Sequence, residues 1–184
     1  MKTIKVPQRA EVSPVNQANF DNITASFGKV PNLYATFAYS EHALNTYLAL
    51  QSSKSSLTAK QKEIINLVVS QVNDCRYCLS AHTVVGKMNG FTDEQILEIR
   101  SGNASFDPKL NVLAQLVKSI ANNKGKVDPT KLENYFAAGY TYENLVDTIV
   151  AVGDKIISNY LHAVTQVPVD FPLASELTES VAHL

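Results

Sequence analysis

The two cysteines of the chain lie three positions apart in the segment VNDCRYCLSAH, residues 72–82. Cys75 and Cys78 are followed by His82, one helical turn beyond Cys78. Because residues four apart on a helix share a face, the His82 imidazole can hydrogen-bond to the Cys78 sulfur, directly or through water. A base beside a thiol is the arrangement that activates a sulfur nucleophile.

The same segment offers a second thiol and a favourable electrostatic position. We expect Asp74 to cap the helix whose first turn holds both cysteines. A helix N-terminus carries about half a positive charge and unsatisfied N–H groups, which favour the reactive thiolate. Cys75 is close enough to Cys78 for a disulfide. This set suits peroxide reduction, in which a thiolate becomes a sulfenic acid, a neighbouring thiol condenses with it, and an external reductant reopens the disulfide.

Glu63 is the candidate for the acid that protonates the leaving oxygen. It is the only acidic residue between Lys54 and Asp74 and lies in an otherwise apolar segment. If that segment is a helix packed against the cysteine helix, the carboxylate lies near the sulfurs. The alternative is a solvent-exposed acid that only complements the helix dipole.

Other interpretations of these residues stay open. Cys75, Cys78 and His82 can supply three ligands to zinc, with Glu63 or water as the fourth, although no second ligand cluster occurs. The thiols can belong to a non-catalytic redox sensor or a thiol–disulfide exchange protein. The cysteines can also be small buried hydrophobic residues beside a core histidine.

Helix signals recur along the rest of the chain and predict an all-α fold, a helical bundle of about eight helices. Ser-Pro and Asp-Pro pairs and two capping boxes mark the starts. The predicted helices span about 14–27, 32–40, 41–50, 58–72, 75–88, 92–100, 108–122, 129–139 and 142–165. We expect the apolar helix 58–72 to be central. Its likeness to 141–164 indicates either internal duplication or two buried helices. An alternating strand pattern occurs only at 3–6, which counts against a thioredoxin fold.

Length and composition indicate one globular domain. The chain has 184 residues, 45% hydrophobic and 18% charged, with a formal net charge of -1. This balance favours neither nucleic acid nor an anionic membrane as a partner. No apolar run approaches the roughly 18 residues of a spanning helix, and the N-terminus has no apolar signal region. We therefore expect a cytoplasmic protein, in which a CxxC pair is catalytic or metal-binding.

The segment KEIINLVVSQVNDCRYCLSAH, residues 62–82, resembles the core motif of the alkylhydroperoxidase AhpD-like / carboxymuconolactone decarboxylase family. That motif is a glutamate, a CxxC pair twelve residues on, and a histidine four residues after the second cysteine. The segments 27–40 and 125–152 are similar to flanking parts of peroxidase-related members, so the resemblance covers most of residues 27–168.

The resemblance implies a single AhpD-like helical domain over residues 1–184, with an N-terminal extension (1–27), the core motif (58–88) and an irregular tail (169–184). It also implies assembly as a homo-oligomer, a trimer or a hexamer. The implied substrate is a peroxide, the implied reductant is a protein or a small thiol, and no metal or haem is needed.

The resemblance further implies a role for each site residue. Cys78 would be the peroxidatic thiol and Cys75 the resolving one, with His82 and Glu63 relaying protons. One departure concerns Tyr77, which stands where the best-studied branch has a second histidine, so the proton relay can differ. The decarboxylase branch lacks the CxxC pair, so the resemblance disfavours lactone decarboxylation.

Overall fold

The computed structural model describes residues 4–177, and this part of the chain is all-helical. It contains one 3₁₀-helix and nine α-helices and no strand, which confirms the predicted fold class. The elements are η1 (Arg9–Glu11), α1 (Pro14–Phe27), α2 (Asn32–Phe37), α3 (Ala43–Ser52), α4 (Ala59–Val72), α5 (Arg76–Met88), α6 (Asp93–Arg100), α7 (Pro108–Asn122), α8 (Pro129–Ala137) and α9 (Tyr142–Thr165).

Most helices begin at the polar residue that the sequence predicted. Six of these polar side chains accept a hydrogen bond from a backbone N–H in the first turn of their helix: Ser13, Thr58, Thr92, Asp107, Asp128 and Thr141. The prediction that Asp74 caps the cysteine helix is wrong. The cap is Cys75, whose sulfur accepts from the Cys78 N–H, because Asp74 lies in a tight turn with a left-handed φ of 49°.

The chain forms two compact units. Among the described residues, the first comprises 4–54 together with Tyr160–Asp170, and the second comprises Ser55–Asn159 together with 171–177. The core of the first unit is built from α1, α2 and α3, and includes Phe37 stacked on Tyr47 with ring centroids 4.3 Å apart.

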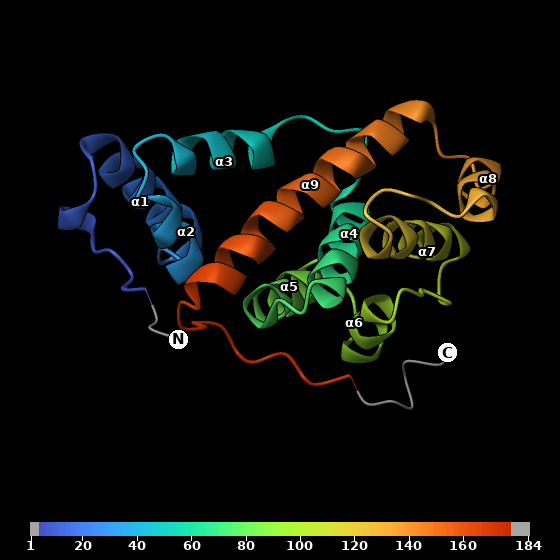
Figure 1. Cartoon of the computed structure of the whole chain (residues 1–184). Helices are drawn as coiled ribbons and strands as arrows, with labels where there is room; N and C mark the ends of the chain where they lie inside the picture. The colour runs from blue at the N-terminus through green and yellow to red at the C-terminus, as the bar shows by residue number, and fades with distance from the viewer. Residues whose placement is uncertain (1–3, 178–184) are drawn as a thin grey trace. The chain divides into compact units, whose positions relative to one another are not determined.

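The second unit is organised around α4, which packs against α5, α6 and α7 (Figure 1). Ile64, Ile65, Leu67, Val68 and Val69 of α4 are completely buried, each at 0% exposure. This burial confirms that the apolar helix predicted at 58–72 is central. The helix therefore provides a rigid support for any side chain that it projects toward α5.

The described part of the tail, 171–177, has no regular secondary structure and lies along α5 and α6. The Ala174 N–H donates to Ser80 Oγ at 3.1 Å, and Arg100 Nη1 donates to the Ser175 carbonyl at 2.7 Å. These bonds hold the described part of the predicted irregular tail (169–184) against α5 and α6; residues 178–184 lie outside the described residues. None of the described helices has both the length and the apolar character needed to cross a membrane.

Candidate functional site

Cys75 and Cys78 form a disulfide at the start of α5, with Cα atoms 5.3 Å apart. Each residue is only 3% exposed. The Cys75 N–H donates to the Ser70 carbonyl at the end of α4, and the Leu79 N–H donates to the Cys75 carbonyl. The disulfide is thus held where the turn between two packed helices enters α5.

Glu63 is buried, with 2% exposure, although it lies near the N-terminal end of α4. Its Oε1 lies 2.8 Å from His82 Nδ1, and its Oε2 accepts from Asn66 Nδ2 at 3.1 Å. The alternative of a solvent-exposed acid that only complements the helix dipole is therefore wrong. The packing of α4 on α5 brings Glu63 to His82, as the sequence predicted only conditionally.

His82 does not make the direct hydrogen bond to the Cys78 sulfur that the helical spacing suggested. Both of its ring nitrogens have other partners, since Nδ1 faces Glu63 and Nε2 lies 2.7 Å from Lys155 Nζ. The side chain is 16% exposed. Three side chains from three helices, Glu63 of α4, His82 of α5 and Lys155 of α9, therefore form one hydrogen-bonded chain.

The charges of this trio follow from burial and from mutual interactions. Burial raises the pKa of the Glu63 carboxyl, but its interactions with His82, and then with Asn66 and Lys155, outweigh burial and lower that pKa overall. Burial lowers the pKa of His82, Lys155 lowers it further, and Glu63 opposes both. At neutral pH Glu63 is therefore an ionised carboxylate and His82 is a neutral imidazole.

Lys155 was not found from the sequence. Burial lowers its pKa, while Asp154 and Glu63 oppose this effect. It is the only lysine in α9, a long helix whose other charged residues, Glu143, Asp147 and Asp154, are acidic. A lone lysine in such a helix is the signal that could have identified it. Asn66, which supports Glu63, carries no comparable signal.

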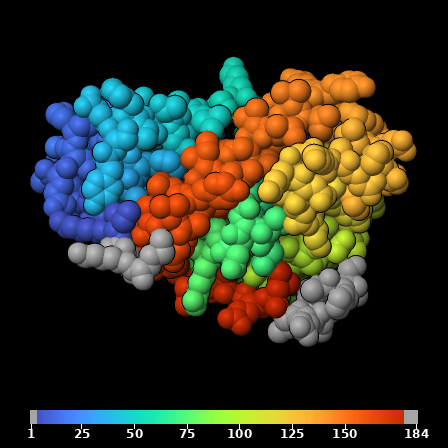
Figure 2. Space-filling model, in the orientation of Figure 1, coloured from blue at the N-terminus to red at the C-terminus, as the bar shows by residue number. Residues whose placement is uncertain are grey.

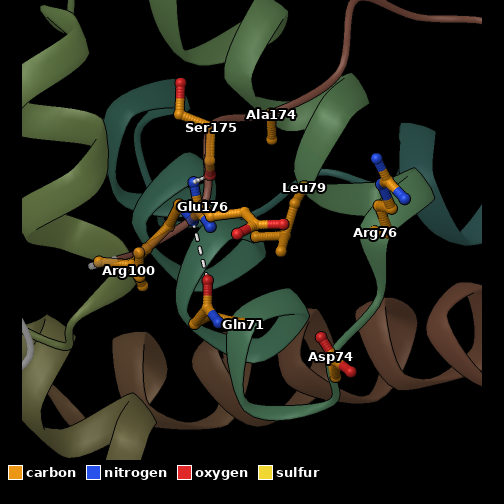
Figure 3. Close-up of a pocket in the computed structure, with 9 residues that line it drawn as sticks. Gln71, Asp74, Arg76, Leu79, Arg100, Ala174, Ser175 and Glu176 are labelled. Carbon is orange, nitrogen blue, oxygen red and sulfur yellow. Dashed lines mark hydrogen bonds between the residues drawn. The ribbon is translucent and has the colours of Figure 1, made fainter. Parts of the chain in front are cut away.

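A pocket of about 320 Å³ borders the cysteine segment. It is lined by Gln71, Asp74, Arg76, Leu79, Arg100 and the tail residues Ala174, Ser175, Glu176 and Leu177. In Figure 3, Arg100 lies at one end with its bonds to Gln71 and Ser175, Arg76 and Asp74 lie at the other, and the Glu176 side chain extends between them. Three of the lining residues, Asp74, Arg76 and Leu79, are sequence neighbours of the two cysteines, so the pocket lies next to the cysteine segment.

The donor set for a metal is not assembled among residues 4–177. No group of three or more His, Cys, Asp or Glu side chains is arranged there to hold an ion. Glu63 and His82 bond to each other, and the two sulfurs are joined.

Comparison with known proteins supports one family. The sequence model of the carboxymuconolactone decarboxylase family matches residues 38–119, which include both cysteines, Glu63 and His82. This match covers 82 of the 184 residues, which is less than half of the chain, and it supports an assignment to the AhpD-like / carboxymuconolactone decarboxylase family. The chain has the all-helical fold of the AhpD-like solved structures.

Individual relatives are similar in sequence or in fold. The uncharacterized protein YdfG of Bacillus subtilis (strain 168) is 25% identical over 103 residues, which are 55% of this chain and 70% of YdfG. The crystal structure of an uncharacterized peroxidase-related protein with an alkylhydroperoxidase AhpD core, from Ralstonia eutropha JMP134, is similar with a TM-score of 0.79 and 17% identity, over 98% of this chain and 94% of that one. An uncharacterized peroxidase-related protein from Silicibacter sp. TM1040 gives a TM-score of 0.75 and 18% identity, over 98% and 93% of the two chains.

Proposed function

We propose that this protein is a thiol peroxidase that reduces hydrogen peroxide or organic hydroperoxides through Cys75 and Cys78. The observation that carries the proposal is the buried disulfide one helical turn from a Glu63–His82 pair. A dithiol that can close a disulfide supplies the two electrons, and a carboxylate bonded to an imidazole can carry the proton that the leaving oxygen needs.

In this mechanism the Cys78 thiolate attacks the O–O bond of the peroxide. The sulfur becomes a sulfenic acid, and the leaving alkoxide or hydroxide takes a proton delivered by Glu63. The Cys75 thiol then attacks the sulfenic sulfur, which releases water and forms the disulfide. An external thiol reductant, a protein or a small molecule, returns the pair to its reduced state.

Peroxide titration of the reduced protein tests this proposal. One equivalent of hydrogen peroxide should convert both thiols into the Cys75–Cys78 disulfide, detected by mass spectrometry of the peptide spanning residues 72–82. In Cys75→Ser the same treatment should leave a sulfenic acid on Cys78, trapped with dimedone. Since the chain has no other cysteine, the thiol count reports this pair alone. Thiols that stay reduced under excess peroxide would overturn the proposal.

Steady-state turnover separates a peroxidase from the alternative, a redox sensor or exchange protein. With dithiothreitol as reductant, a peroxidase should consume many equivalents of tert-butyl hydroperoxide per chain. A Glu63→Gln variant should lose about 10²-fold or more in rate, as expected when an acid–base group is removed. A single oxidation without turnover would favour the sensor. A cytoplasmic location accompanies the proposal, because a cycling CxxC pair needs reducing surroundings.

We also propose that the protein assembles as a homo-oligomer through α9. Large apolar side chains repeat along one face of this helix and are exposed: Tyr142, Val146, Ile149, Val150 and Ile157. These positions fall on one helical stripe that contains no charged residue. Figure 2 shows α9, coloured orange, at the surface of the molecule. An uncharged apolar stripe of this kind is suited to burial against another copy of the chain.

Light scattering coupled to size-exclusion chromatography tests the assembly. The wild type should elute as an oligomer, a trimer or a hexamer, and the double variant Val146→Glu/Ile149→Glu should dissociate. Glu133→Lys, which changes an exposed charge on α8, is the control and should leave the mass unchanged. A wild-type monomer at tens of micromolar would contradict this proposal and leave the peroxidase proposal intact.

A further inference from the structure

Lys155 is a buried lysine whose ammonium group faces a histidine. The residue is 3% exposed, and its Nζ lies 2.7 Å from His82 Nε2. Within residues 4–177 it forms no ion pair with a carboxylate. A buried ammonium is costly, and a well-packed apolar side chain at such a position is often neutral or stabilising. Packing therefore does not explain a lysine here.

The hydrogen-bonding partners of His82 fix its tautomer. An ionised carboxylate only accepts hydrogen bonds, so the Nδ1 that faces Glu63 carries the proton. In the neutral ring Nε2 then has only a lone pair, and it requires a donor. The Lys155 ammonium, which only donates, is that donor.

We propose that Lys155 is a positioning residue of the Glu63–His82 relay, which holds His82 in the neutral Nδ1–H form and supplies the proton that the relay delivers. This inference deepens the proposed peroxidase function and rests on it where proton delivery is concerned. The tautomer is a property of the resting protein and needs no turnover.

The proton balance of the cycle agrees with this role. In the peroxide step a proton passes from Lys155 Nζ to His82 Nε2 while the Nδ1 proton passes to Glu63 and on to the leaving oxygen. Lys155 becomes a neutral amine, and the charges of His82 and Glu63 are unchanged. When a dithiol reductant reopens the disulfide, one cysteine returns as thiolate and one proton is released. That proton enters through Glu63 to His82 Nδ1 while the Nε2 proton passes back to Lys155, which restores the ammonium and the Nδ1–H form of His82 and closes the cycle.

The groups that surround Lys155 favour the loss and recovery of its proton. His82 and Glu63 approach it from α5 and α4, and Asp154 precedes it on α9. Asp154 Oδ1 is buried without a hydrogen-bond partner among the described residues. Burial lowers the pKa of Lys155, which makes its neutral amine easier to reach than that of an exposed lysine.

Nitrogen-15 NMR of the oxidised protein, labelled at histidine, tests the inference without peroxide. His82 is identified by the signal lost in His82→Gln. At pH 7.5 the wild type should show a protonated Nδ1 and an unprotonated Nε2. In Lys155→Met, Nε2 loses its donor and its neighbouring cation, so the ring should take up a second proton and the midpoint of its titration should move to higher pH. Lys155→Arg should retain the wild-type pattern.

Kinetics provides the second readout. Lys155→Met should lower the rate of Cys78 oxidation by about 10²-fold, the lower end of what a positioned proton-transfer group contributes. Lys155→Arg should recover part of the loss. Lys87→Met, which removes a half-exposed lysine elsewhere on α5, is the matched control and should leave both His82 and the rate unchanged.

Several results would overturn the assignment of Lys155. A wild-type His82 that is protonated on Nε2 alone, or is doubly protonated at pH 7.5, would do so and requires no variant. An unchanged His82 titration in Lys155→Met would show that any loss of rate has another cause. If the tautomer and its shift are found but no variant reduces peroxide, the positioning role stands and the peroxidase proposal fails.

Discussion

Replacing Glu63 with glutamine removes one charge from the buried trio and keeps the size of the side chain. Wild-type Glu63 accepts from His82 Nδ1 and from Asn66 Nδ2. Glutamine can still accept from His82 through its carbonyl oxygen. Its amide nitrogen would then face the Asn66 amide, so two donors would meet where a donor and an acceptor met before.

The expected loss of stability is about 2 kcal/mol. A hydrogen bond to a charged group contributes about 1.5–3 kcal/mol and a neutral one about 0.5–1.5, so the change at His82 costs about 1 kcal/mol. The mismatched donor of Asn66 adds about 1 kcal/mol, the lower end for an unsatisfied buried group. Little solvent screening reduces these values, since Glu63 is 2% exposed.

The pH dependence separates this explanation from a packing defect. His82 has a folded-state pKa below its ordinary 6.5, so both proteins lose stability as the pH falls through that region and the unfolded chain takes up a proton. Glu63→Gln should lose more, because its His82 lacks the carboxylate that opposes burial. The stability gap between the proteins should therefore widen once the pH falls below the folded-state pKa of wild-type His82, which lies under 6.5.

At lower pH the gap should close again. The pKa of Glu63 is lower in the folded protein than its ordinary 4.5, so its contribution is complete above that value and is lost as the pH falls through the folded-state pKa. A protonated Glu63 then resembles glutamine. Urea unfolding of the oxidised proteins, followed by circular dichroism between pH 3.5 and 8, measures this profile.

Glu133→Gln on α8 is the control, because Glu133 is exposed; its stability should stay within about 0.5 kcal/mol of wild type. If Glu63→Gln were as stable as wild type at pH 7.5, the ionised carboxylate would not stabilise the fold. A gap that is constant with pH would indicate a steric defect in place of a lost charge.

Three further predictions concern the scaffold of the second unit. Leu113→Ala should destabilise the protein by about 2–5 kcal/mol in urea unfolding, because Leu113 is fully buried and its loss leaves a cavity. Asp107→Ala should cost about 1 kcal/mol, since Asp107 caps α7 through two backbone N–H groups, and Asp107→Asn should restore most of the loss in thermal unfolding. Gly102→Ala should cost about 1 kcal/mol or more, measured by the shift in urea midpoint, because Gly102 has φ of +89° and a Cβ there would lie 2.3 Å from Lys118 Cδ.

Much of the fold could be predicted because its helix starts are encoded locally. Thr58 and Thr92 each begin a capping box, and Asp107 caps a helix that proline opens. The short helices were less well defined. The second helix ends at Phe37, whereas its apolar pattern continued to residue 40. Cys75 caps α5 in place of Asp74, because the turn requires a left-handed residue at Asp74.

The site was predictable only where its residues share one helix or one family motif. Cys78 and His82 lie on α5 and Cys75 is its N-cap, so helical spacing alone related them. Glu63 needed the packing of α4 on α5, and the family resemblance supplied what the spacing could not. Lys155 lies 73 positions from His82 in sequence, and only tertiary structure brings the two together.

The structure favours the two cysteines as nucleophile for different reasons. A test can show which reason decides which sulfur attacks the peroxide. The Cys75 sulfur accepts the Cys78 N–H at 3.3 Å, so the N-terminus of α5 favours a thiolate on Cys75. Cys78 lies on the face that leads to His82 and Glu63. Attack on the peroxide requires a thiolate and also a proton for the leaving oxygen. The position of Cys78 favours it for the second requirement alone, because Cys78 lies on the face that leads to the proton relay. We therefore expect sulfenic acid on Cys78 in Cys75→Ser and slower oxidation of Cys75 in Cys78→Ser. The reverse order would mean that the helix terminus, and not the proton relay, decides which sulfur attacks.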